Sequence, residues 1–147
     1  MRISRKFWRW AGLGLALAFV AFFVVRTWVV PAVIEFLDAG SLRAAASTFP
    51  GGLPDDAGFL LVVEVDTTEE DVEEVTTALR EAGGAVVRPD PRELWRWRDG
   101  VSIAVAAQYG GKLSEDIAVP VEHLADAIAR TVEIGARHDL EACSWGH

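Results

Sequence analysis

The sequence predicts a small domain built from both strands and helices, and three observations support this class. A Val-rich apolar run at 59–65 has the length and composition of a buried strand. Apolar residues then recur at helical spacing after an acidic start, and Asp90 followed by Pro91 signals a second helix. The predicted order is strand, helix, strand, helix, strand, helix, strand. It fits a parallel α/β sheet or an antiparallel α+β sheet with helices on one side, and the pattern alone leaves both open.

The composition indicates one folded domain with an appendage. The chain has 147 residues, of which 51% are hydrophobic and 24% charged, and its formal net charge is -8. An acidic chain is a poor partner for a nucleic acid, whose backbone is itself negative. Cys143 is the only cysteine, which excludes an internal disulfide. Its place in an apolar run favours a core residue over a reactive thiol.

Residues 1–30 are the appendage. Residues 10–25 carry no charge, and four basic residues precede them: Arg2, Arg5, Lys6 and Arg9. We expect an N-terminal hydrophobic helix over residues 1–30 that serves as a single-pass membrane anchor with its N-terminus inside. The rival interpretation is a helix buried in the protein, which would leave the chain cytoplasmic.

The chain after residue 48 divides into alternating elements. Residues 48–58 are rich in Pro and Gly and predict a loop, which leads into the strand at 59–65. Thr67 and Glu70 have capping-box spacing, and the helix that they begin ends at Gly83-Gly84. Further short strands are expected at 85–88, 117–119 and 140–144, and Pro120 opens the last helix.

The helix that begins at Asp90 presents two faces. The core face is predicted from apolar spacing and consists of Trp97, Val101 and Val105. A second face, at offsets of three and seven, consists of Trp95, Arg98 and Ser102. A guanidinium binds a carboxylate through two parallel hydrogen bonds, so Arg98 is the principal candidate for a ligand contact. The alternative is a solvated arginine paired with Asp99 or Glu93.

Other polar residues have weaker claims to a function. His147 is a candidate metal ligand or general base, although a lone histidine at this position is more often without a role. His123 and His138 are expected to face solvent. Glu64, inside an apolar strand, is expected either to be paired or to lie at a sheet edge. Glu115 and Asp116 suit a turn in which Lys112 pairs with them. No glycine-rich phosphate loop and no serine- or cysteine-centred nucleophile can be assembled from the sequence.

Five segments in order resemble the C-terminal domain of FAD-linked oxidases, a group that includes the glycolate oxidase FAD subunit, D-lactate dehydrogenase and D-2-hydroxyglutarate dehydrogenase. The segments are 30–38 (VPAVIEFLD), 60–66 (LLVVEVD), Leu94-Trp95 with Arg98, 115–120 (EDIAVP) and Gly146-His147. The resemblance implies an α+β cap with an antiparallel sheet, and it favours that fold over the parallel alternative. It therefore suggests residues 31–147 as a partial FAD-linked oxidase domain.

The resemblance also implies roles for individual residues. Arg98 would grip the substrate carboxylate, and Ser102 would supply a hydroxyl one turn later. His147 would ligate a divalent metal such as zinc in metal-dependent members, although the second histidine and the later acid of that pattern do not follow it. No residue is assigned to catalysis or to FAD.

The activity that the resemblance implies is FAD-dependent oxidation of a small 2-hydroxy acid to a 2-oxo acid. Because the flavin domain is missing from the sequence, we expect a fragment that contributes the substrate-binding cap and is inactive alone. A separate flavin-domain subunit would complete it. The alternatives are a membrane-anchored α+β binding module without catalysis and a non-functional gene fragment.

Overall fold

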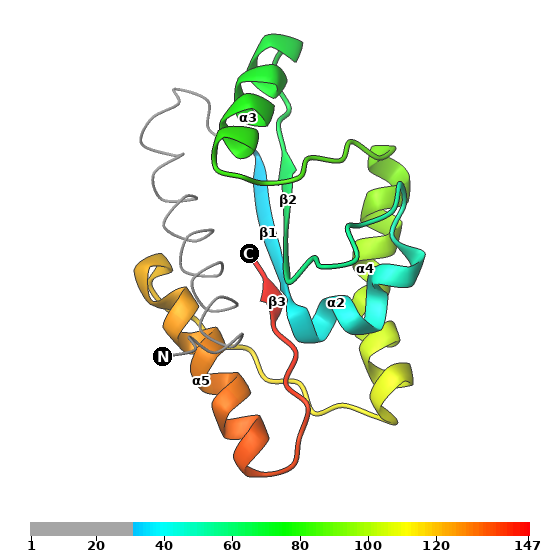
Figure 1. Cartoon of the computed structure of the whole chain (residues 1–147), viewed down its shortest axis with the longest axis vertical. Helices are drawn as coiled ribbons and strands as arrows, with labels where there is room; N and C mark the ends of the chain where they lie inside the picture. The colour runs from blue at the N-terminus through cyan, green and yellow to red at the C-terminus, as the bar shows by residue number, and fades with distance from the viewer. Residues whose placement is uncertain (1–30) are drawn as a thin grey trace, which may run out of the picture.

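The computed structural model describes residues 31–147, which fold around a three-stranded antiparallel sheet with strand order β2-β1-β3 (Figure 1). The central strand β1 (Val33–Asp38) pairs with β2 (Phe59–Glu64) along its whole length. On its other edge it pairs with the short C-terminal strand β3 (Trp145–Gly146). The antiparallel α+β prediction is confirmed, and the parallel alternative is wrong.

Neighbouring side chains of β2 point to opposite faces of the sheet, so helices cover both faces. Val62 belongs to the main core, where it packs with Trp97 and Val101 of α4 (Pro91–Tyr109). Val63 instead packs against Val75 of α3 (Glu69–Glu81). The prediction that all helices lie on one side is therefore wrong, because β2 has apolar residues on both sides of the pleat and each side must be covered.

Two shorter helical segments complete the main core. α2 (Ala39–Ala45) follows β1 directly, and its N-terminus is capped by Asp38, whose Oδ1 accepts a hydrogen bond from Ser41 N at 2.8 Å. Helix η1 (Ala46–Thr48) continues it toward Phe49. The indole of Trp97 donates to the Ala45 carbonyl at 2.9 Å, which joins α4 to the end of α2. These contacts hold α4 against the sheet.

The last helix returns the chain to the sheet edge. η2 (Val121–His123) leads into α5 (Leu124–Arg137), as Pro120 predicted. Near its end, Gly135 lies so close to the returning chain that an added Cβ would be 2.8 Å from the Leu140 carbonyl oxygen. The segment from Leu140 then runs to β3, so the strand expected at 140–144 in fact begins at Trp145.

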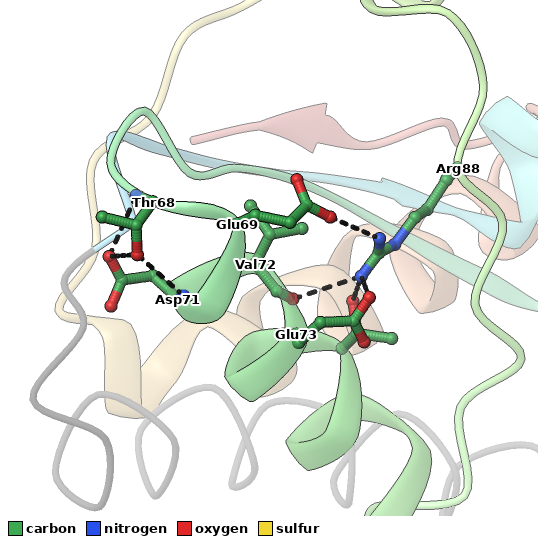
Figure 2. A network of polar contacts seen from close by, with 7 residues as sticks. Thr68, Glu69, Asp71, Val72, Glu73 and Arg88 are labelled. Carbon is green, nitrogen blue, oxygen red and sulfur yellow. Dashed lines mark hydrogen bonds and ion pairs between the residues drawn. The ribbon is translucent and has the colours of Figure 1, made fainter.

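The strand predicted at 85–88 is not formed. Polar contacts of Arg88 explain the path that this segment takes. Arg88 reaches back to α3, where it forms ion pairs with Glu69 at 3.3 Å and Glu73 at 3.0 Å (Figure 2). It also donates to Thr76 Oγ1 at 2.6 Å. The segment therefore lies along the helix instead of joining the sheet.

Two more predicted boundaries differ from the structure. Residues 117–119 have no strand partner within the described part of the chain, and Ile117 is 71% exposed. The capping box of α3 is formed by Thr68 and Asp71, one residue later than predicted. Hydrogen bonds from the Thr67 and Thr68 hydroxyls and from the Thr68 N–H lower the pKa of Asp71.

The predicted hydrophobic helix over residues 1–30 lies outside the described residues. Among the helices that the structure describes, none has both the length and the apolar character needed to cross a membrane.

The two glycines inside α4 and α5 predict opposite effects of substitution by alanine. A Cβ at Gly100 meets no atom within 4 Å, so Gly100→Ala should stabilise the domain by about 1 kcal/mol through helix propensity. Gly135→Ala should destabilise it by about 1–3 kcal/mol, because the Cβ collides with the returning backbone. Denaturant unfolding of both variants measures the two changes. Equal effects would contradict the close approach at Gly135.

Candidate functional site

The second face of α4 makes a polar contact at each of three steps along the helix. Trp95 Nε1 donates to Glu64 Oε2 of β2 at 2.9 Å. One turn later, Arg98 Nε donates to Glu35 Oε2 of the central strand. After another turn, Ser102 accepts a hydrogen bond from Lys112, which also lies over the Trp145 ring of β3. The predicted common face of Trp95, Arg98 and Ser102 is therefore a row of polar contacts along the sheet.

The contact between Arg98 and Glu35 is the most buried ion pair of this row. Their side chains are 16% and 12% exposed. Glu35 faces Val62 across the β1–β2 ladder, a position that otherwise belongs to the core. The alternative in which Arg98 pairs with Asp99 or Glu93 is wrong. Nη1 and Nη2 of Arg98 make no hydrogen bond to residues 31–147.

A second cation, Lys112, lies beyond the end of α4 and contacts Ser102, one helical turn after Arg98. Lys112 Nζ is 2.5 Å from Ser102 Oγ and 5.3 Å from the centroid of the Trp145 ring. The predicted pairing of Lys112 with Glu115 and Asp116 is not observed. Sequence reasoning missed Lys112 as a site residue because no helical or strand periodicity relates it to Ser102.

The strand register brings His147 toward the same place. In the β1–β3 ladder, Leu37 pairs with Trp145 and Phe36 with Gly146. Continued by one residue, this register places His147 opposite Glu35, the partner of Arg98. Directly opposite residues of an antiparallel pair lie on the same face of the sheet. His147 itself is exposed, whereas Glu35 is buried.

The predicted metal site finds no support among residues 31–147, where no group of three or more His, Cys, Asp or Glu side chains could hold a metal ion. His147 is exposed, and His123 and His138 face solvent as predicted. Glu64 is also exposed and lies on the edge strand β2, as the edge interpretation required.

A flavin nucleotide does not fit the helix ends that usually bind a pyrophosphate, which need free N–H groups. Asp38 occupies the start of α2, and the Thr68–Asp71 box occupies the start of α3. At the start of α4, Asp90 Oδ1 accepts from Arg92 N at 2.9 Å and from Glu93 N at 3.2 Å. Each of these N-termini is closed by its own carboxylate, which would also repel a phosphate.

An open hollow of about 490 Å³ lies apart from the predicted residues, between α4 and the end of α2. Its lining consists of Ala45, Thr48, Pro50, Glu93, Arg96, Trp97, Gly100 and Ala104. Neither Arg98 nor Ser102 reaches it. The hollow and the polar row are therefore different surfaces of the same helix.

These features define an α+β domain that carries a buried Arg98–Glu35 ion pair and closes the N-termini of α2, α3 and α4 with acidic side chains. Residues 11–147 match the family described as FAD linked oxidases, C-terminal domain. The match covers most of the chain, and the chain belongs to this family, as its five motifs indicated.

Two relatives illustrate the likeness, and both are named glycolate oxidase subunit GlcD. The chain is 26% identical over 133 residues to the protein of Bacillus subtilis (strain 168), an alignment that covers 84% of this chain and 28% of the relative. It is 27% identical over 133 residues to the protein of Escherichia coli (strain K12), an alignment that covers 84% of this chain and 27% of the relative. The chain thus spans little more than a quarter of the length of these relatives.

The cysteine beside this site should react slowly. Burial raises the pKa of the Cys143 thiol to about 11, and the nearby Asp38 carboxylate adds to the shift. Because the folded pKa is raised, the thiol stays protonated to higher pH than in the unfolded chain, and the stability that this confers is lost as pH rises from about 9 toward 11. At pH 9, a disulfide reagent should label the native chain much more slowly than the denatured chain. Equal rates would contradict the burial of the thiol.

Proposed function

We propose that this chain contributes the carboxylate-binding part of a FAD-dependent 2-hydroxy acid oxidoreductase. The observation that carries the proposal is the hydrogen bonding of the Arg98 guanidinium. Its Nε edge is held by Glu35 of the central strand, while Nη1 and Nη2 bond to no residue in the range 31–147. Such an arrangement presents a flat pair of donors, which matches the two oxygens of a carboxylate.

The surroundings of Arg98 suit a small, polar acid. Ser102 lies one turn along α4, and Lys112, beyond the end of that helix, donates to it. They offer a hydroxyl and a second cation for the substrate hydroxyl or the far carboxylate oxygen. In this proposal His147, which follows β3, serves as an acid or base near the substrate. In this proposal the chain binds and orients the 2-hydroxy acid.

The family implies FAD in the parent enzyme, and the relatives are named as subunits of glycolate oxidase. Since the starts of α2, α3 and α4 are closed by acidic side chains, FAD would be held by polypeptide other than residues 31–147. A flavin-bearing partner is therefore part of the proposal. A small 2-hydroxy acid such as glycolate is its substrate class.

Replacement of Arg98 by lysine tests the proposal without leaving Glu35 unpaired. Lysine keeps the positive charge but loses the planar pair of donors, so glycolate should bind about tenfold more weakly to the Arg98→Lys variant. Titration of the labelled chain with sodium glycolate, followed by amide and indole chemical shifts, measures the change.

Arg96 provides the matched control, because it lies two residues away on α4 and lines the separate hollow. Arg96→Lys should leave the glycolate titration unchanged. The proposal is contradicted if the unmodified chain binds no glycolate, or if the two lysine variants behave alike.

A further inference from the structure

Glu35 occupies a position that the fold assigns to the core. It lies in the middle strand between Val33 and Leu37, opposite Val62, and the whole residue is 9% exposed. Leu37, two residues along on the same face, is completely buried. A carboxylate in such a place costs free energy unless it has a partner, so its presence requires a physical reason.

Stability is a poor reason. Replacing a buried ion pair by apolar side chains of similar volume is often neutral or stabilising, because both charges lose their hydration. The same face of the sheet already supplies Leu37 and Val62 to a continuous apolar core, to which α4 adds Val101. The domain therefore does not need a charge on this strand to hold α4.

The geometry of the contact gives a better reason. A guanidinium has a side edge, which contains Nε, and an end, which consists of Nη1 and Nη2. Glu35 accepts from Nε and so occupies the side edge. An arginine side chain has several rotatable bonds. The Glu35 carboxylate, held on a rigid strand, removes most of that conformational freedom before a ligand binds. The end of the guanidinium is then directed away from the strand.

We infer that Glu35 is a positioning residue, which holds Arg98 by its Nε edge so that a ligand carboxylate is bound end-on by Nη1 and Nη2. This inference rests on the proposed function and extends it with a residue and a binding geometry. Glu35 does not touch the ligand in this arrangement. It also lowers the net positive charge of the site, so it favours orientation at some cost in simple attraction for anions.

Two variants with the same change of charge separate these effects. Glu35→Gln removes the charge but keeps an oxygen that accepts from Arg98 Nε, whereas Glu35→Leu removes both. The Nε–H resonance of Arg98 in a nitrogen–proton NMR spectrum should stay protected in the unmodified chain and in Glu35→Gln. It should exchange rapidly in Glu35→Leu. Glycolate should bind Glu35→Gln at least as tightly as the unmodified chain and Glu35→Leu about tenfold more weakly.

Glu64 supplies the matched control, since it accepts a hydrogen bond from Trp95 on the same face of α4 and does not touch Arg98. Glu64→Gln and Glu64→Leu should change neither the Arg98 signal nor the glycolate titration. If Glu35→Leu fails to fold by thermal unfolding, Glu35→Asp replaces it. Aspartate keeps the charge but withdraws the carboxylate by one methylene, so the protected signal should again be lost.

The outcomes separate this inference from the proposed function. An Arg98 signal and a glycolate affinity that are the same in Glu35→Gln and Glu35→Leu would overturn the positioning role. If the unmodified chain binds no glycolate, the proposed function fails, and the Nε–H signal then decides alone whether Glu35 holds Arg98. If the signal is lost in Glu35→Leu but kept in Glu35→Gln, the result supports the positioning role of Glu35. If the signal persists in both variants, that role is refuted.

Discussion

The pleat of the central strand is the constraint on which the rest of the domain depends. β1 is paired on both edges, so its side chains can point only to the two faces of the sheet. Leu37 on one face and Phe36 on the other are both buried, at 0% and 9% exposure. Each face therefore needs a cover, which α4 and α3 provide. The same alternation sends Glu35 to the α4 face, where a buried carboxylate requires a cation.

The partner that meets this requirement is set by the geometry of α4. Successive contacts of its polar face also move along the ladder, from the level of the Val33–Glu64 pair to that of Glu35–Val62 and then to that of Leu37–Trp145. Trp95, Arg98 and Ser102 thus reach β2, β1 and the Lys112–Trp145 contact in order. Only the middle contact is a buried ion pair. The outer contacts involve exposed Glu64 and exposed Lys112, and a rim of exposed charges contributes little to stability.

Local chemistry explains which parts of the fold were predictable. α3 and α4 carry capping residues and a 3.6-residue apolar repeat, and β2 is an uninterrupted Val-rich run, so each can be found without knowledge of the rest. β1 was missed because its apolar residues follow a long apolar stretch almost directly, with only Pro31 and Ala32 between them. The strand propensity at 85–88 was real, but Arg88 gains ion pairs and hydrogen bonds along α3 that pairing in the sheet would forfeit.

The candidate site likewise has a part that the local sequence predicts and a part that it does not. Helical spacing alone put Arg98 and Ser102 on one face, because that relation lies within two turns of one helix. Glu35 is 63 residues from Arg98 in the chain, and nothing in the local sequence connects the two. Lys112 and His147 are likewise related to the site only through the return of the chain to the sheet. Contacts of this range follow from strand register, and a shift by one residue would send every side chain of β3 to the other face.

The distribution of charge gives the domain a particular kind of anion site. The N-termini of α2, α3 and α4, which elsewhere attract phosphates, are neutralised by Asp38, Asp71 and Asp90. Positive charge that can meet a ligand is instead carried by side chains along the polar face of α4. A side-chain site of this form selects by the shape of a carboxylate, whereas a helix end would accept any small anion. Glu35 sharpens that selection, because it leaves Arg98 one free end and fixes the plane in which that end lies. A domain built in this way suits the carboxylate-binding role proposed for it.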